Sequence, residues 1–536
     1  MTPTLTERLV SLNPTIEKIC KTSGVPGLSL GVSQGGNVIH RFNYGFSDLE
    51  ASLPTNSDTI YGIGSVSKTF TATAIAQLVS DKKLEWSTRL KDILQDFRSR
   101  SPLVASEATV EDLLTHRLAL SRSNNWWYGS DGDLILDKNQ TLSAYSQLKP
   151  VGLFRGQFDY SNWNYAVAGE VIERVSGQTY GEYISSSITV PLGLQSTTAI
   201  HGSVPHLRVA KPYVALDNLD FYQLPRPKAQ SGTIMGPAQG VLSSVNDLLA
   251  YASAMMSSAA SADAKAPKLK GIDQQLAGHI FTVMSTRESS YGLGLFRHQL
   301  PGVISGTGAN GMFAKELPVL VPGGNARLVI SHPGSLAGYT SFFAMLPEID
   351  VGIAVLTNSI GLADPSAWIG HVLIEVLVET PSPVDIMQFV EEAAQNHVQS
   401  YPKLQKTFDQ LRRNSSTPPE SLDDYIGIYQ FAGDLDFKIV IRFNDKKALQ
   451  VVFQGIESQA WDLQFLEGET FHWLMSRDDQ AKKAKFTYPF LPSLFKIVFE
   501  RDGEGLVDHL MWKHDPAEDP EDQLFKKTSR TRETSL

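Results

Sequence analysis

The sequence predicts an α/β fold in which one sheet is assembled from both ends of a first unit and a separate antiparallel β unit follows. Strand-like runs occur at residues 28–43 and again at 326–358, and the block between them is mostly helical. Short alternating strands at regular spacing return after a polar, proline-containing linker at 414–421. Strands from both ends of a unit, with helices packed on the sheet that they form, make one of the few stable layer architectures.

The first unit opens with a hairpin and a buried helix. Residues 28–33 and 38–43 are short strand-like runs, and Gly35 and Gly36 between them suit the positive φ angles of a tight turn. The segment 65–81, SVSKTFTATAIAQLVSD, is apolar on most sides and rich in small residues. This composition is typical of a helix inside a domain.

The middle of the chain has mostly helical periodicity. Residues 108–118 and 164–184 follow the helical repeat, and Gly177 is placed to end the second helix. The region 200–325 is rich in Gly, Pro, Ser and Ala and contains one clear helix, at 245–256. We expect the first unit to span 1–380, with a sheet part at about 1–90 and 325–380 and a helical part at about 91–324.

The end of the chain has a different composition. A helix and linker are expected at 381–421, and alternating strands indicate an antiparallel β domain at 422–515. The segment 516–536, which contains DPAEDPEDQ, is expected to be a polar, solvated tail.

Composition excludes several classes of function. A net charge of -10 without a long Lys/Arg run argues against nucleic-acid binding, which needs a concentrated basic face. The single cysteine, Cys20, excludes an intrachain disulfide framework and a thiolate zinc cluster, and the 12 histidines show no metal-ligand spacing. The sequence has neither a secretory signal nor an apolar run of about 18 residues, so no membrane association and a cytoplasmic location are expected.

The stretch 61–70, YGIGSVSKTF, places two serines just before one lysine at a helix start. Residues three apart share a helix face, whereas neighbours point about 100° apart, so Ser65 can contact Lys68 and Ser67 projects away from it. Unpaired backbone N–H groups at a helix start can bind an oxyanion. A lysine with a lowered pKa can then serve as base. A serine in this position is also an ordinary helix cap, so both interpretations remain open at this point.

Two later segments extend the pattern. Tyr160-Ser161-Asn162 and then His332-Pro333-Gly334 follow the Ser-x-x-Lys in order. This succession resembles the serine β-lactamase and penicillin-binding-protein superfamily. The flanking segments 113–116, 173–184, 190–198, 240–251, 291–296 and 345–359 stand in the order typical of class C β-lactamases, D-aminopeptidases and related esterases. The similarity covers about residues 15–380.

The resemblance implies a fold and a catalytic set. The fold would be an antiparallel sheet sandwiched by helices plus an all-helical subdomain, with a C-terminal β-barrel-like domain. Ser65 would be the acylated nucleophile and Lys68 its partner. Tyr160, as a phenolate or as a phenol coupled to Lys68, would relay a proton, and Asn162 would bond Lys68 or the substrate.

The resemblance also implies substrate-binding residues on a late strand. His332 would replace the lysine of the commoner Lys-Thr-Gly strand. The backbone N–H groups of Ser65 and Ser335 would form the oxyanion hole, since Ser335 follows Gly334. Because histidine is largely neutral at neutral pH, a permanent charge for a β-lactam carboxylate is missing, and efficient penicillinase activity is not expected.

Two departures from the family pattern concern the rim of the site. The family often has LLTHTSGL, whereas this chain has LLTHRLALS at 113–121. A conformationally special Ser-Gly turn is therefore expected to be lost. Trp126, Trp127 and Tyr128 follow, and they are expected either to wall a pocket for an apolar or bulky substrate or to pack in the core.

We expect a serine acyl-enzyme hydrolase of an ester or amide bond in a small molecule. One alternative is an acyltransferase, or a thioester-releasing enzyme of secondary metabolism, that uses the same residues. A D-amino-acid-specific peptidase and a catalytically silent binding scaffold are further alternatives. Acyl-enzyme chemistry requires no cofactor or metal. The sequence carries no signal for an oligomeric state.

Overall fold

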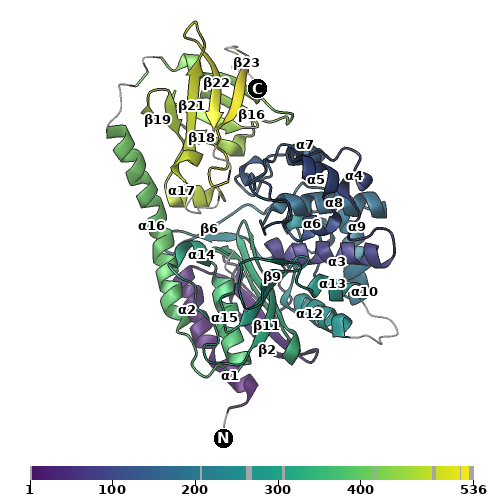
Figure 1. The fold of residues 1–536 in the computed structure, drawn as a ribbon. Coiled ribbons are helices and arrows are strands. Elements are labelled where there is room, and N and C mark those ends of the chain that lie inside the picture. The colour runs from purple at the N-terminus through teal and green to yellow at the C-terminus, as the bar shows by residue number, and fades with distance from the viewer. Residues whose placement is uncertain are drawn as a thin grey trace.

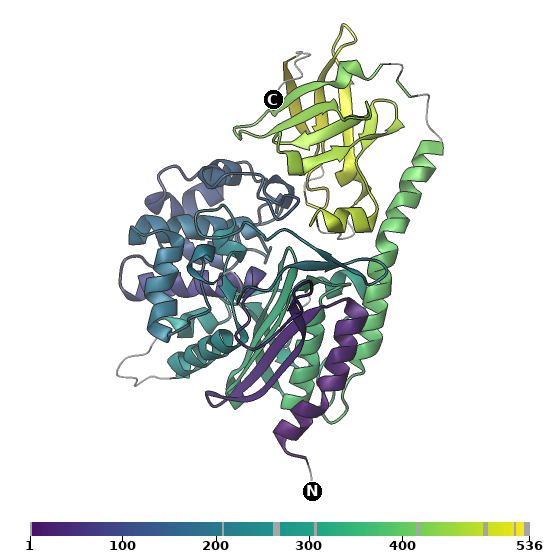
Figure 2. The same ribbon diagram turned by 180° about the vertical axis from the view of Figure 1, so that it is seen from behind.

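The computed structural model of the chain describes residues 3–205, 208–260, 269–304, 308–413, 418–419, 421–485, 491–518 and 521–529. Its three parts are a large sheet covered by helices, a helical part beside the sheet, and a β unit at the far end of the long helix α16 (Ile386–Arg413) (Figure 1). Figure 2 shows from behind that the first strands of the chain lie beside strands from much later in the sequence.

The large sheet combines strands from both ends of the first unit, as predicted, but it also takes three strands from residues 280–300, which were expected to belong to the helical part. Its order is β3 (Leu53–Pro54), β2 (Asn37–Asp48), β1 (Gly27–Gln34), β13 (Val351–Thr357), β12 (Tyr339–Leu346), β11 (Arg327–Leu336), β10 (Phe296–Leu300), β9 (Ser289–Tyr291) and β8 (Ile280–Phe281). The two ends meet where β1 pairs antiparallel with β13, from Leu28 opposite Thr357 to Gln34 opposite Val351. The predicted α/β fold class is confirmed.

Helices cover both faces of this sheet, which explains why β12 and β13 are buried along their whole length. On one face lie α1 (Leu5–Ser11), α2 (Asn13–Ser23), α15 (Pro365–Leu377) and part of α16. On the other face α12 (Val245–Ala260) packs on β1 and β13. Deeper in the molecule, α3 (Ser67–Ser80) is buried from Ser67 to Leu78, as predicted for the segment after the hairpin.

The helical part consists of short helices around α8. They are α4 (Leu90–Ile93), α5 (Pro102–Glu107), α6 (Val110–Leu114), α7 (Thr141–Ser146), α8 (Asn162–Ser176), α9 (Tyr180–Ile184), α10 (Val190–Leu192), α11 (Gly236–Gln239) and α13 (Ile272–Leu276). Helix α8 ends at Gly177, whose φ of 73° is left-handed, as the sequence predicts. Within the described ranges, none of the helices combines the length and apolar character needed to cross a membrane.

Small pairings connect these parts. One is the strand pair β4 (Tyr61–Gly62) with β7 (Leu242–Ser243), and another is the three-stranded sheet β14 (Ser359–Ile360), β5 (Tyr213–Ala215) and β6 (Phe221–Gln223). The remaining short element is the helix α14 (Asn310–Phe313). The β4–β7 pair brings the residues just before Ser65 against the segment that follows α11.

The C-terminal β unit is one antiparallel sheet that nearly closes on itself. Its order is β18 (Ala460–Asp462), β17 (Leu449–Phe453), β16 (Lys438–Phe443), β15 (Gly427–Phe431), β23 (Gln523–Ser529), β22 (Val507–Trp512), β21 (Lys496–Arg501), β20 (Thr470–His472) and β19 (Gln464–Glu467), with α17 (Arg477–Lys482) beside it. The two edge strands, β18 and β19, are separated in the chain only by Leu463, so the edges lie near each other. The barrel-like form is as predicted.

The boundary expected between the C-terminal β domain and a tail is also wrong. The segment 516–536 was expected to be a polar tail, but β23 lies within it and pairs with both β15 and β22. Gln523 and Phe525 are buried, whereas Lys526 is exposed. Only one large apolar side chain of this strand is fully buried, and an acidic run precedes it, so the alternation is too weak to be recognised in the sequence.

Candidate active site

Ser65 lies in a single 3₁₀ turn, Gly64–Val66, directly before α3. It is partly exposed, whereas every other residue from Tyr61 to Phe70 is buried. Gly64 has a φ of 52°, and a Cβ added there would lie 2.6 Å from the backbone nitrogen of Ser335. A glycine is therefore required for the backbone before Ser65 to pass this close to β11.

Lys68 follows one turn later and is fully buried. Its Nζ lies 3.1 Å from Ser65 Oγ, 2.8 Å from Asn162 Oδ1 and 3.0 Å from the carbonyl oxygen of Ala238 in α11. None of these three partners is a carboxylate. Burial lowers the pKa of Lys68 well below its usual value of 10.5, which favours the neutral amine.

The partners of Lys68 determine where its lone pair points. A neutral amine has two N–H groups, and the amide oxygen of Asn162 and the carbonyl oxygen of Ala238 can only accept hydrogen bonds. When both N–H groups are used in this way, the lone pair is left for the hydroxyl of Ser65. This is the arrangement of a general base beside a nucleophile.

Ser67, the other serine of the stretch, has a different partner. Its side chain is fully buried, and its Oγ accepts a hydrogen bond from the backbone N–H of Val241 at 3.0 Å. Val241 in turn accepts a backbone hydrogen bond from Ile63. Ser67 thus connects the start of α3 to the segment after α11.

Tyr160 is placed to exchange a proton with the serine and the lysine. Its ring centroid lies 4.9 Å from Lys68 Nζ. Burial raises the pKa of its phenol well above the usual value, and a hydrogen bond with the Ser65 side chain lowers it only in part. Of the two forms expected from the sequence, the structure therefore favours the neutral phenol at neutral pH.

The ring of His116 packs against the ring of Tyr160. The two rings lie 4.5 Å apart, and His116 Nδ1 accepts a hydrogen bond from the backbone N–H of Ser161 at 3.1 Å. Burial holds the pKa of His116 well below its usual value, so the ring is neutral. In the sequence this residue stands out only as part of the LLTH segment, without a role of its own.

His332 lines the same cavity but has no free ring nitrogen. Its Nδ1 lies 2.6 Å from the carbonyl oxygen of Pro333, which can only accept, so Nδ1 carries the hydrogen. In a neutral ring Nε2 then accepts from the hydroxyl of Tyr291 at 3.2 Å. Burial lowers the pKa of His332 to about 3, so this strand presents no positive charge at neutral pH.

The backbone of Ser335 faces the turn that holds Ser65. Leu336 and Tyr339 flank the two-residue turn of the β11–β12 hairpin, and Ser335 pairs with Thr340. In an antiparallel ladder the hydrogen-bonded pairs alternate, so the N–H of Ser335 points away from β12. Gly334 before it allows a close approach, because a Cβ there would lie 2.2 Å from the carbonyl oxygen of Ile63.

These groups share one cavity of about 200 Å³. One part of its lining holds Ser65, Tyr160, His332 and Ser335, and the lining also includes Asp364. Among the described residues, no Lys or Arg side chain lines the cavity. Burial raises the pKa of Asp364 to about 6.

Asp364 also has a structural role, since it caps the N-terminus of α15. Its Oδ1 accepts hydrogen bonds from Ser366 Oγ at 2.6 Å and from the backbone N–H of Ala367 at 3.1 Å. Neither of these bonds uses Oδ2. The cavity therefore contains a carboxylate that no cationic side chain of its lining balances.

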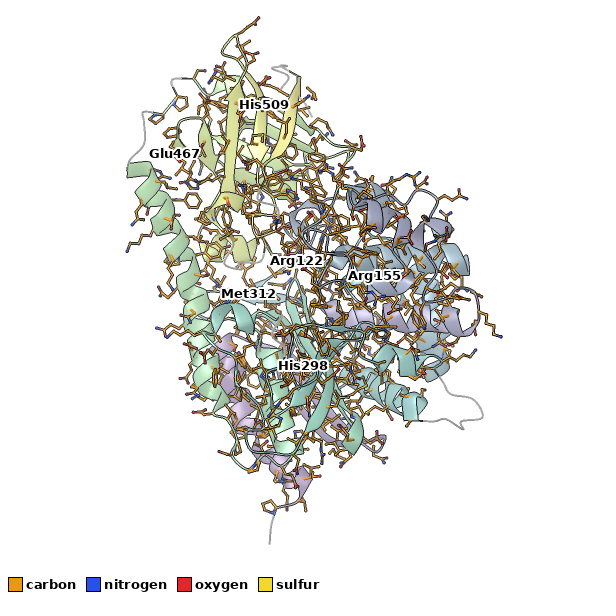
Figure 3. All side chains as sticks on the ribbon, viewed as in Figure 1. Arg122, Arg155, His298, Met312, Glu467 and His509 are labelled. Carbon is orange, nitrogen blue, oxygen red and sulfur yellow. The ribbon has the colours of Figure 1, made fainter. Side chains whose placement is uncertain are left out.

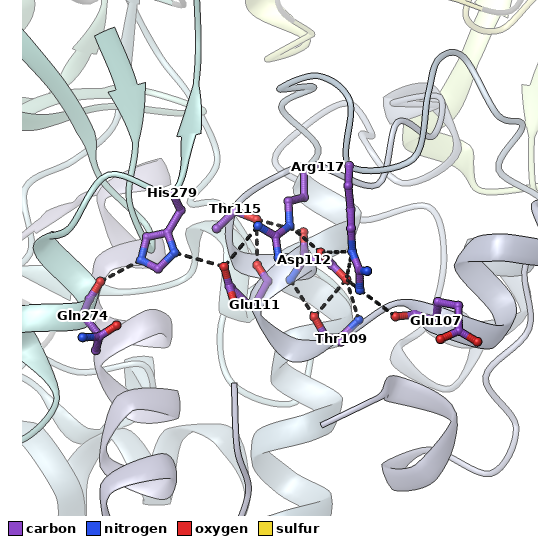
Figure 4. A network of polar contacts seen from close by, with 9 residues as sticks. Glu107, Thr109, Glu111, Asp112, Thr115, Arg117, Gln274 and His279 are labelled. Carbon is purple, nitrogen blue, oxygen red and sulfur yellow. Dashed lines mark hydrogen bonds and ion pairs between the residues drawn. The ribbon is translucent and has the colours of Figure 1, made fainter. Parts of the chain in front are cut away.

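The loop after α6 keeps a special turn that was expected to be lost. Ala119 stands where the pattern LLTHTSGL has its glycine, and its φ of 50° is left-handed. The conformation persists without glycine because neighbouring contacts hold the loop on both sides. On one side, the buried carboxylate of Asp112 forms ion pairs with Arg117 and with the exposed Arg155 and accepts a hydrogen bond from the backbone N–H of Thr109 (Figure 4).

That network is electrostatically balanced. Burial opposes ionisation of Asp112, but hydrogen bonds from Arg155 and the charge of Arg117 together lower its pKa. Glu111 extends the network to His279, whose Nδ1 lies 3.1 Å away on the far side (Figure 4). The loop that presents His116 is therefore tied to the edge of the large sheet.

The aromatic triplet after this loop packs in the core and does not line the cavity. Trp126 and Trp127 are 2% and 4% exposed. Trp126 stacks on His514 of the β unit, with ring centroids 4.6 Å apart, and the Tyr128 hydroxyl donates to the carbonyl of Ala484 at 3.1 Å. Of the two expected roles, core packing is the one that the structure supports.

In the part of the chain that the structure describes, there is no group of three or more His, Cys, Asp or Glu side chains that could hold a metal ion. The described site residues suit acyl transfer by side chains and backbone N–H groups.

Comparison with known proteins gives consistent matches. A family model described as Beta-lactamase matches residues 12–371. Penicillin-binding protein 4 of Amycolatopsis lactamdurans is 26% identical over 341 residues, which cover 60% of this chain and 84% of that protein. Unguisins hydrolase ungD' of Aspergillus campestris is 27% identical over 243 residues, 43% of this chain and 44% of that protein.

One solved structure matches nearly the whole chain. The octameric penicillin-binding protein homologue from Pyrococcus abyssi aligns with a TM-score of 0.56 and 20% identity, covering 97% of this chain and 100% of that chain. At this identity the match concerns the fold alone, and it includes the C-terminal β unit.

Proposed function

The chain belongs to the beta-lactamase family and is a serine hydrolase of that type, and on this premise we propose that Ser65 attacks an ester or amide carbonyl of a small molecule. The attack forms an acyl-enzyme, which water then releases. The observation that carries the proposal is the environment of Lys68 Nζ, where two acceptor-only oxygens leave the lone pair to the Ser65 hydroxyl.

The proposed acylation step forms a bond between Ser65 Oγ and the carbonyl carbon and breaks the bond from that carbon to the leaving oxygen or nitrogen. Overall, the serine loses one proton and the leaving group gains one, by way of Lys68 and Tyr160. As Ser65 Oγ bonds to the carbonyl carbon, its proton passes to Lys68 Nζ, and the backbone N–H groups of Ser65 and Ser335 bind the oxyanion. Tyr160 then gives its hydroxyl proton to the leaving alcohol or amine and takes one from Lys68. In deacylation water loses its proton along the same route, and Ser65 leaves as the hydroxyl.

A silent binding scaffold accounts less well for this environment. A fully buried lysine without a carboxylate partner is costly to the fold, and a scaffold gains nothing from it. The names of the relatives favour water over another acceptor, since they include an Unguisins hydrolase and a Beta-lactamase. No observation specifically favours an acyltransferase or a D-amino-acid peptidase.

Intact mass after incubation with a fluorophosphonate tests the proposal. We expect one adduct on the wild type and none on Ser65→Ala. A panel of p-nitrophenyl esters, D-amino-acid amides and nitrocefin then identifies the bond that is cleaved, and added hydroxylamine reports transfer to an acceptor other than water. A wild-type chain that no acylating probe modifies would contradict the proposal and favour the scaffold.

A further inference from the structure

We propose that the C-terminal β unit positions Lys68, although none of its described residues lines the cavity. The connection runs through the loop 122–126 and the side-chain amides of Asn124 and Asn162. The inference rests on the proposed function, because it takes Ser65 and Lys68 to be the reacting pair.

The outer side of the loop is held by the segment 514–518, which follows β22. The backbone N–H of Arg122 donates to Glu518 Oε2 at 2.7 Å, and that of Ser123 donates to Asp515 Oδ2 at 2.8 Å. The guanidinium of Arg122 also forms ion pairs with Glu518 and, at 3.4 Å, with Asp159. Figure 3 places Arg122 at the junction of the β unit and the helical part.

Two more contacts extend this hold along the loop. Asn125 Nδ2 donates to the carbonyl oxygen of His514 at 2.8 Å, and the ring of His514 stacks on Trp126 with an interplanar angle of 9°. Of the five residues 122–126, all except Asn124 therefore contact one short segment of the β unit.

The loop needs this support because its backbone is strained. Ser123 has a φ of 37°, a left-handed conformation that non-glycine residues rarely adopt. Such a conformation persists only where surrounding contacts fix it. The bond from the Ser123 N–H to Asp515 is a contact of this kind.

The inner side of the loop reaches the lysine through two amides. Asn124 Oδ1 accepts hydrogen bonds from Trp127 Nε1 at 3.0 Å and from Asn162 Nδ2 at 3.5 Å. An Asn162 amide that turns its Nδ2 toward Asn124 must turn its Oδ1 the other way, where it accepts from Lys68 Nζ at 2.8 Å. Asn124 thereby determines which end of the amide faces Lys68.

The consequence is a positioning role for Asn124. If the Asn162 amide rotates by half a turn, its NH₂ group faces the amine and Lys68 loses one of its two acceptors. The lone pair is then no longer directed at Ser65. Binding of a substrate in the cavity is not expected to change, because neither Asn124 nor the segment 514–518 lines it.

The test compares labelling of full-length variants by a fluorophosphonate, with the rate constant at saturating probe separated from the apparent binding constant. Asn124→Ala should lower the rate constant by about 10- to 100-fold and leave the binding constant unchanged, because a misplaced base costs rate. Asn124→Asp keeps an acceptor for Asn162 Nδ2 and should retain the maximal rate constant at high pH, although its added charge raises the pH at which Lys68 loses its proton. Equal rates for wild type and Asn124→Ala would overturn the inference.

A double-mutant cycle tests whether the β unit acts through the same residues. Asp515→Ala with Glu518→Ala should lower the rate constant, and adding Asn124→Ala should cause no further loss, because contributions through one path are not additive. Asp515→Asn with Glu518→Gln keeps the acceptor oxygens and should retain most of the rate. The inference would be overturned if the fold-losses in rate constant of Asn124→Ala and of the Asp515→Ala, Glu518→Ala variant multiplied in the triple variant. It would also be overturned if the Asp515→Ala, Glu518→Ala variant were folded and labelled at the wild-type rate.

Glu521→Gln is the matched control. It removes a neighbouring ion pair with Lys149, at 2.8 Å, without a contact to the loop 122–126, and should label at the wild-type rate. A slow Glu521→Gln would show that any damage to the interface reduces the rate, which would overturn the specific route through Asn124. Absence of labelling at Ser65 in the wild type would overturn the proposed function itself.

Discussion

Ser67 Oγ accepts a hydrogen bond from the backbone N–H of Val241 at 3.0 Å, in a position where both groups are fully buried. Ser67 is therefore part of the packing around the site. Its hydroxyl contacts the segment after α11, whereas the hydroxyl of Ser65 contacts Lys68. The two serines differ in partner, in exposure and in the effect that their removal should have.

Ser67→Ala should reduce stability and keep activity. Without the hydroxyl, the Val241 N–H is left unpaired in the interior, which costs about 1–3 kcal/mol in the free energy of unfolding. Urea unfolding measures this loss, and the fluorophosphonate labelling rate of the folded variant should match the wild type. Ser65→Ala should show the opposite pattern, with stability retained and labelling abolished. Loss of labelling in both variants would sink the assignment of Ser65.

Lys68→Arg should reduce the labelling rate by at least about 100-fold, because a guanidinium stays charged and cannot accept the serine proton. In the wild type the rate should rise with pH as Lys68 loses its proton, with a midpoint well below 10.5. Fluorophosphonate labelling that is quenched at a series of times, repeated across the pH range, measures both effects. Lys485→Arg is the control, since Lys485 is a second buried lysine, bonded to the Tyr128 carbonyl oxygen. An active Lys68→Arg would exclude Lys68 as base.

The enzyme should discriminate between two acyl donors that are identical except that one carries a carboxylate where the other carries a neutral carboxamide. The cavity lining described here has no Lys or Arg and includes Asp364, so the neutral donor should have at least about a tenfold higher kcat/KM, roughly 1.4 kcal/mol. The assay belongs above the Asp364 pKa of about 6. Equal values, or a preference for the anion, would refute this prediction.

The same comparison in Asp364→Asn tests the origin of the selectivity. Asparagine keeps an oxygen that caps α15 but removes the charge, so the preference should shrink while the fold persists. Asp137→Asn changes another aspartate that stands before a helical turn, and it should leave the preference unchanged.

Acid should weaken the contact between the β unit and the helical part through His514. Burial and the charge of Lys149 lower the pKa of His514 to about 3 in the folded chain, against about 6.5 when unfolded. Between these values the unfolded state binds the extra proton, so stability is lost as the pH falls. From about pH 7 to about pH 5 the wild type should lose about 2 kcal/mol more than His514→Phe, which keeps a stacking ring without a titrating group. Parallel losses in urea unfolding at both pH values would contradict this.

The sequence was sufficient for the architecture of the large sheet and for the order of the motifs. Strand-like runs at 28–33, 38–43 and 326–358 are local signals, and the sheet they predict is confirmed, as is the resemblance to the β-lactamase superfamily. The contact of Ser65 with Lys68 follows from spacing alone, and the structure places the two atoms 3.1 Å apart. The roles of these residues stay predictions.

The rest depends on contacts between distant segments, for which the sequence has no periodic signal. Ala238 O, which decides the direction of the Lys68 lone pair, lies 170 residues away in a short helix. The neutral state of His332 depends on burial, and the partner of its Nε2, Tyr291, lies in another strand. Asn124 lies in a loop whose conformation is fixed by Asp515, and neither residue belongs to a recognisable motif.

The position of β23 has a consequence for biosynthesis. This strand joins two half-sheets, β15–β18 and β19–β22, so residues 523–529 have to leave the ribosome before the β unit can be completed. Until then each half-sheet has an open edge beside β15 or β22, and unpaired edges promote association between chains. The hydrolase part can form its core much earlier in translation, yet the loop at Arg122 has to await contacts made by Asp515 and Glu518. Nascent chains stalled before β23 would therefore hold a formed sheet and nucleophile while this loop still lacks its support.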